Sequence, residues 1–135
     1  MIQKHLFQWM KTNPALQALF GDRFYHEWAP QNVSTWPLVT FRLLSGIEVA
    51  EDMEDEDGSE IDSFRYEFQV AARKSIDADN AAIIFDREIR NFRGTMGAVT
   101  VQRVEFANRS DLGEMIGDKQ IRKVALDYSI FFTAN

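Results

Sequence analysis

Two stretches of alternating side chains constrain the fold of this chain more than any other feature. In residues 64–72 and again in residues 124–132, every second position is apolar. Successive side chains of a strand point to opposite faces of its sheet, so both stretches are predicted to be strands with one buried face. The chain therefore has to build a sheet with a core on at least one side.

Helix signals come before the first of these strands. Residues 2–11 carry apolar side chains at helical spacing and predict an amphipathic helix. Asn13 followed by Pro14 predicts the capped start of a second, short helical turn. Gly21 is expected to end that turn in a left-handed conformation.

The main helix is predicted between the two alternating strands. Six apolar side chains between residues 78 and 92 form one stripe at helical spacing. Ser75 or Asp77 is expected to cap this helix, and Gly94 is expected to end it.

The segment after this helix changes its pattern of alternation. Within residues 99–106 the apolar positions switch from odd to even numbers, which predicts a β-bulge near Gln102 and Arg103. Residues 108–118 are polar and contain two glycines, so a loop is expected there.

These elements predict a single domain over residues 1–135. Short strands are expected at residues 24–28 and 38–44, and the composition is that of a globular chain, with 45% apolar residues and eleven Phe. The order of elements predicts an α+β fold, a two-layer sandwich of a mainly antiparallel sheet with two helices packed on one face.

The charge of the chain is concentrated in one acidic loop, residues 50–62. Its acids are Glu51, Asp52, Glu54, Asp55, Glu56, Asp57, Glu60 and Asp62. The whole chain carries a net charge of −6, so the other residues together carry +2. A concentrated negative field repels nucleic-acid phosphates, so specific nucleic-acid binding is not expected.

No pattern in the chain predicts a catalytic, cofactor or metal site. An EF-hand register with Gly58 at the sixth position puts Met53 first and Phe64 last, which removes two required ligands; weak binding of divalent ions by the clustered acids stays open. His5 and His26 lack ligand spacing, and there is neither a cysteine nor a nucleophile or phosphate-loop motif. An enzyme is therefore not expected.

Membrane and secretion signals are not expected either. No apolar run approaches the roughly 18 residues of a membrane-spanning helix. The first residues do not form a secretion signal, because Trp9, Lys11 and Asn13 interrupt any apolar stretch.

Several segments occur in an order that resembles one protein family. They are Asn-Pro-Ala-Leu at 13–16, Gly-Asp-Arg-Phe-Tyr at 21–25, Trp-Pro-Leu-Val-Thr-Phe at 36–41, Phe-Gln-Val at 68–70, Asn-Phe-Arg-Gly at 91–94 and Val-Ala-Leu-Asp-Tyr at 124–128. This ordered set covers nearly the whole chain and resembles the tail completion, or tail terminator, proteins of long-tailed bacteriophages. The chain departs from the family pattern in its heavy acidity at 51–62 and in residues 111–118.

The resemblance implies a structural protein of the virion tail that is assembled in the host cytoplasm. Such proteins form a ring, typically of six copies, on the head-proximal end of the tail tube. The ring ends tube polymerisation and provides the head-joining surface. The implied partners are further copies of the chain, the tail tube protein and a head-tail connector or neck protein, while DNA passes through without specific binding.

Two sets of residues are candidates for such a role. The eight acids of the acidic loop are expected to face the lumen or the tube end. A subunit interface is expected where the second faces of strands and the basic residues of the second half would lie exposed on a monomer. Its candidates are Leu38, Leu44, Arg103, Arg122, Lys123 and Phe131.

Two other functions compete with this interpretation. A head-side neck or adaptor protein, that is a head-tail connector, would share the ring geometry. The acidic loop could also belong to a DNA-mimicking inhibitor of a nucleic-acid-binding protein, although its acids lie in one segment rather than across a surface.

Overall fold

A computed structural model describes residues 2–30, 35–48, 62–96, 99–116 and 119–134. Three helices and six strands lie in these ranges. In chain order they are α1 (Ile2–Thr12), α2 (Pro14–Phe20), β1 (Phe24–His26), β2 (Leu38–Glu48), β3 (Asp62–Ala72), α3 (Ser75–Ile89), β4 (Gly94–Met96), β5 (Val99–Ile116) and β6 (Lys119–Ala134).

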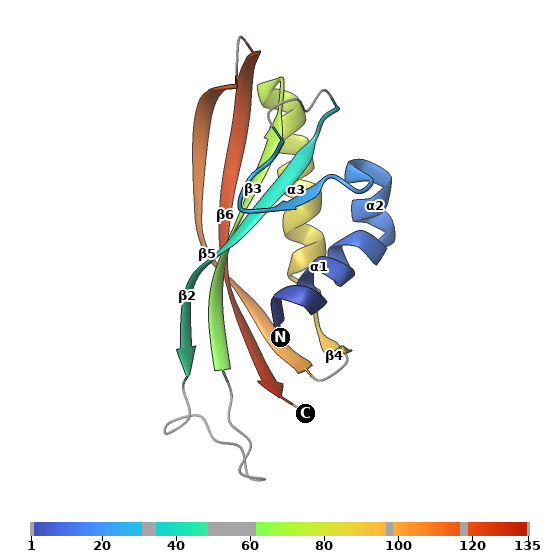
Figure 1. Cartoon of the computed structure of the whole chain (residues 1–135), viewed down its shortest axis with the longest axis vertical. Coiled ribbons are helices and arrows are strands. Elements are labelled where there is room, and N and C mark those ends of the chain that lie inside the picture. Colours follow the sequence, from blue (N-terminus) through green and yellow to red (C-terminus); the bar gives the residue numbers. More distant parts are fainter. Residues whose placement is uncertain (1, 31–34, 49–61, 97–98, 117–118, 135) are drawn as a thin grey trace.

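The six strands form one sheet in the order β1-β2-β3-β6-β5-β4. Only β1 and β2 pair in parallel; all other neighbours are antiparallel. The helices lie together on one side of this long, twisted sheet (Figure 1). The predicted α+β class and mainly antiparallel sheet are confirmed, but three helices rather than two contribute side chains to the core.

Local signals correctly placed the second helix. The Asn13 side-chain oxygen accepts a hydrogen bond from the Leu16 backbone N–H at 3.1 Å, and Pro14 occupies the first helical turn. Gly21 follows the helix with a φ of 60°, a conformation that is costly for any residue with a Cβ atom. These three residues therefore define both ends of α2.

The ends of α3 differ from the prediction. Lys74 is the N-cap residue and makes no side-chain capping bond, so neither Ser75 nor Asp77 caps the helix. The helix ends at Ile89, and Gly94, with a φ of 101°, begins β4 instead. Packing of the apolar stripe on β3 and β6 stabilises α3 without a cap.

The expected polar loop at 108–118 is wrong. β5 continues to Ile116 and pairs with β6 along its whole length. Polar side chains show that this part of the hairpin is solvated, but they do not prevent its backbone from pairing. The predicted bulge is confirmed by a register shift between Val101 and Arg103, and a second shift follows Phe106.

The core between the helices and the sheet is centred on Phe68 of β3. This fully buried ring lies 5.0 Å from the ring of Phe85 in α3, 5.9 Å from Tyr128 in β6 and 6.2 Å from Phe41 in β2. One side chain thus contacts three other elements of the fold. The contact with Phe41 is stacked, that with Phe85 is tilted and that with Tyr128 is edge-on. Aromatic contacts of this kind add to the free energy gained by burying the rings.

A polar contact joins α3 to β6 next to this core. The Tyr128 hydroxyl donates a hydrogen bond of 2.6 Å to Asp86, and Arg90 donates to both Asp86 carboxylate oxygens at 2.9 and 3.0 Å. Burial and the hydrogen bond to Asp86 raise the pKa of Tyr128. Burial raises the pKa of Tyr66 to about 12.

Replacing Phe68 by Ala should strongly destabilise the fold. The loss of apolar burial and the cavity left behind are expected to lower the free energy of unfolding by about 3–5 kcal/mol. Urea denaturation followed by circular dichroism measures this change. Trp28→Ala, at a side chain that is 82% exposed, serves as the control and should change stability by less than about 0.5 kcal/mol.

Stability should fall steeply with pH above about 10. A tyrosine whose pKa is raised in the folded state stabilises the fold only while it stays protonated, so this stabilisation is lost as pH rises from the unfolded pKa of 10.0 through about 12. Each such tyrosine contributes a slope of up to about 1.4 kcal/mol per pH unit. Denaturation at pH 9 to 12 tests this, and Tyr66→Phe should reduce the slope; an unchanged slope would contradict it.

Candidate interaction surface

The face of the sheet that points away from the helices carries paired charges. The Arg42 Nε lies 3.1 Å from Glu67 Oε1, and the Arg65 Nη2 lies 3.1 Å from Asp127 Oδ2. Asp127 is only 8% exposed although it is charged. The ion pair with Arg65 offsets the cost of burying this carboxylate, so these charges have structural partners within the chain.

Leu38 does not lie on an exposed face as expected. It is 1% exposed and packs with Ala71 and Ile121 in a second, smaller core. Ala29 and Trp36, which lie between β1 and β2 in the sequence, pack against this cluster and cover that end of the outer face. The monomer itself therefore already buries Leu38, which removes the reason for assigning it to an interface.

The structure brings together two other predicted interface residues. The Arg103 guanidinium lies over the Phe131 ring, 4.1 Å from its centroid, and Phe131 is half-buried. The Arg103 Nε also lies 3.0 Å from Glu105 Oε1. Leu44 lies apart from this pair, on β2, and is 39% exposed.

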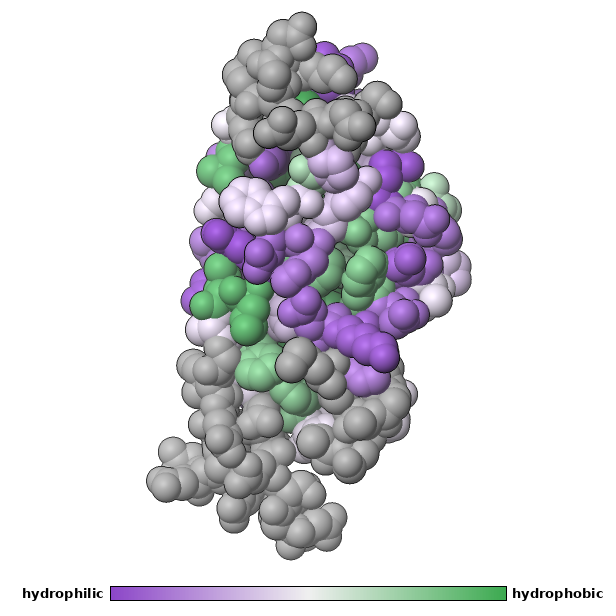
Figure 2. Space-filling view, viewed as in Figure 1, coloured by the Kyte–Doolittle hydropathy of each residue, from purple (hydrophilic) through white to green (hydrophobic). Residues whose placement is uncertain are grey.

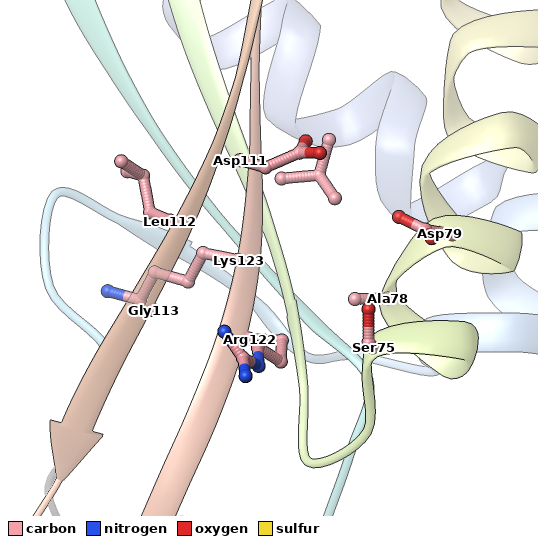
Figure 3. Close-up of a pocket in the computed structure, with 9 residues that line it drawn as sticks. Ser75, Ala78, Asp79, Asp111, Leu112, Gly113, Arg122 and Lys123 are labelled. Atoms are coloured by element: carbon pink, nitrogen blue, oxygen red, sulfur yellow. The ribbon is translucent and has the colours of Figure 1, made fainter.

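Arg122 and Lys123 lie beside a small pocket between α3 and the β5–β6 hairpin. Its volume is about 130 Å³. The residues around it are Ser75, Ala78, Asp79, Asp111, Leu112, Gly113, Arg122, Lys123 and Val124. Asp79 and Asp111 lie on opposite sides of the pocket, whereas the Lys123 side chain points away from α3 (Figure 3).

The two carboxylates of this pocket are held by one arginine. Arg109 lies 3.1 Å from Asp79 through Nη2 and 3.1 Å from Asp111 through Nε. The hydrogen bond to Asp111 and the two negative charges raise the pKa of Arg109. The pocket is smaller than the roughly 300 Å³ of typical ligand sites. Its arrangement therefore fits a link between helix and hairpin better than a site of catalysis.

Most of the predicted acidic loop lies outside the described residues. Glu48 ends β2 and Asp62 begins β3, and these two residues pair with each other in the sheet. These described ends of β2 and β3 lie at the end of the sheet opposite the ends of β5 and β6 at Ile116 and Lys119 (Figure 1). The proposed orientation of its acids toward a lumen stays a prediction.

Several large apolar side chains are exposed that no sequence pattern assigned to a site. They are Trp28, Leu43, Ile76, Ile83, Phe106 and Leu112, in addition to Leu44. On the side shown in Figure 2, hydrophobic groups reach the surface between hydrophilic ones. Alternation assigns Leu43 to the core side of β2, so its exposure could not be read from the pattern.

Within the described ranges, His, Asp and Glu side chains form no group of three or more that could hold a metal ion. His26 lies 3.8 Å from Glu27, and its ring lies 5.3 Å from that of Phe41. The described helices are all too short or too polar to cross a membrane.

The fold is shared with a protein of known structure. No protein-family model matches the chain, and no curated protein matches it. One chain of a structure described as the virion of a native gene transfer agent (GTA) particle superposes on it with a TM-score of 0.70. The match covers 99% of this chain and 95% of the other at 15% sequence identity. At this identity, the likeness shows that the two chains have the same fold over their whole length.

Proposed function

We propose that this chain is a structural virion protein that caps the head-proximal end of a phage tail tube as a ring. The ring ends polymerisation of the tube and offers the surface to which the head joins. The protein acts by shape and contact, without covalent chemistry. Its partners are other copies of the chain, the tail tube protein and a neck protein.

The observation that carries this proposal is the full-length likeness to a chain of the gene transfer agent virion. The likeness extends over nearly the whole of both chains, so it concerns complete domains rather than a common motif. Parts of the ordered segments that resemble tail terminator proteins lie in elements that form the core, such as Pro14 to Leu16 in α2 and Phe68 to Val70 in β3. Both observations support a structural protein of a phage-like particle.

The distribution of charge supports a ring through which DNA passes. The described outer face pairs its arginines with carboxylates, as in Arg42 with Glu67 and Arg65 with Asp127. Such a face offers few unpaired cations to DNA phosphates, which bind proteins mainly through Lys and Arg. The acidic loop adds negative charge, and six copies would bring its carboxylates close enough to repel DNA within a screening length of about 8 Å.

Mixing the purified protein with purified tail tubes should produce a cap at one end of each tube. Electron microscopy is expected to show added density at that end, and the capped tubes should no longer grow when tube protein is supplied. Tubes incubated with an unrelated acidic protein of similar mass serve as the control. Tubes that keep growing at both ends would contradict the proposal.

Deleting the gene from a phage or phage-like particle separates this role from that of a neck protein. Loss of a terminator is expected to give tails of uncontrolled length, because nothing covers the growing tube end. Loss of a neck protein would instead give tails of normal length that do not attach to heads, and this result would favour the alternative.

Reversing the charge of the acidic loop should impair DNA passage or capping. Replacing its eight acids by Lys would attract DNA phosphates to the ring. Replacing them by Asn and Gln removes the charge without reversing it and is the matched control, expected to have a weaker effect. Particle yield and infectivity measure the outcome, and normal infection by the Lys variant would exclude this role of the loop.

A further inference from the structure

The two outermost strands of the sheet, β1 and β4, are short, so each leaves part of the next strand, β2 or β5, without a neighbour on that side. β1 pairs with β2 only at residues 39–41, and β4 pairs with β5 only at residues 99–101. In the described part of the chain, no strand covers residues 42–48 of β2 or the continuation of β5 after residue 102. An uncovered edge presents free N–H and C=O groups and readily pairs with a strand of another chain.

The uncovered parts of β2 and β5 lie at the two ends of the same rows of paired residues across the sheet. Following the strand register across the sheet, the row that begins at Arg42 passes through β3 and β6 and ends at Asn108. The row that begins at Ile47 ends at Arg103 in the same way. Three antiparallel pairings separate β2 from β5, so the two edge strands also run in opposite directions.

One row carries an exposed apolar side chain at each of its ends. Leu43 pairs with Tyr66, Tyr66 with Tyr128, and Tyr128 with Phe106. The two tyrosines lie in the core, yet Leu43 is 45% exposed and Phe106 is 41% exposed, because each lies on an edge strand. The same row therefore ends in two hydrophobic side chains on the same face of the sheet.

Phe106 is held in place by its neighbours. Its ring lies 5.7 Å from the ring of Tyr128, and the Arg90 guanidinium lies 5.0 Å from its centroid. The hydrogen bonds of Arg90 and Tyr128 to Asp86 fix both of these contacts. An apolar side chain that is already ordered loses little conformational entropy when a partner covers it.

The polar residues of the two edges are compatible as well. In neighbouring rows, Arg42 would meet Asn108, and Ser45 would meet Glu105. Neither combination opposes like charges, which would weaken strand pairing. The two edges therefore lie in the same rows, run antiparallel, carry one exposed apolar side chain each and place no like charges opposite each other.

We propose that the occupant of each open edge is a second copy of this chain. The β2 edge of one copy pairs antiparallel with the β5 edge of the next, and Leu43 packs against Phe106 of that neighbour. This contact is heterologous, so it closes a ring when the rotation between neighbouring copies, about an axis roughly parallel to the strands, divides a full turn evenly. In such a ring both open edges of every copy are paired. Pairing of two identical edges would cover only one edge of each copy.

The inference deepens the proposed function and rests on it for the closure of the ring, but the contact itself can be tested separately. The chain contains no cysteine, so introduced cysteines report only the chosen contact. The double variant Leu43→Cys with Phe106→Cys is treated with a short thiol cross-linker, both as concentrated free protein and bound to tail tubes. A tilt of the strands would shift the register, so Val104→Cys and Arg109→Cys each replace Phe106→Cys in parallel samples.

A ladder of covalent oligomers is expected from the double variant, and only dimers from an equal mixture of the two single variants. The yield of oligomers should exceed that of the control pair Ile83→Cys with Phe106→Cys by about 10-fold or more, because adjacency raises the effective thiol concentration. Ile83 is exposed on α3 and serves as the matched control.

Three results would overturn the proposal or separate it from the function. Dimers from Leu43→Cys alone or from Phe106→Cys alone would show pairing of identical edges and overturn it. Capped tubes without a ladder in any register would also overturn it while leaving the capping function intact. A ladder without capping would support the edge contact and contradict the capping function.

Discussion

The packing of aromatic rings around Phe68 is the interaction on which the rest of this structure depends. Phe68 comes from a central strand and contacts rings of a neighbouring strand on either side and of α3. Protein interiors are packed as densely as organic crystals, so this cluster sets the distance between the sheet and the helix. The hydrogen bonds of Asp86 then orient α3 relative to β6, and with it the arginine beside Phe106.

Outside this core, most of the charged groups described above are paired within the chain, whereas two strand edges are open. The pocket beside α3 is small and its carboxylates are held by Arg109. On the outer face Arg65 forms an ion pair with Asp127, so these two charges are already paired within the chain. What a partner can use is the backbone of the open edges and the apolar side chains beside them. Each backbone hydrogen bond formed along an edge contributes about 0.5–1.5 kcal/mol net to the pairing of an added strand.

Some sequence patterns located elements of the fold correctly, and others did not. Alternation located β3 and the second half of β6, and a change of parity located the bulge at Gln102. The polar half of β5 was missed because side-chain polarity reports contact with water and not backbone pairing. Leu38 was assigned to an exposed face because the residues that cover it, among them Trp36, belong to a segment without a regular pattern.

The sequence by itself determined the buried faces of the strands and the ends of α2, because these depend on residues only a few positions apart. It also carried the family resemblance from which the tail function was inferred. Only the tertiary structure decided which strands lie at the edges of the sheet. Leu43 and Phe106 follow the same alternation as buried neighbours, yet both are exposed. Their exposure depends on which segments far apart in the chain pair as strands, and local sequence patterns do not indicate that pairing.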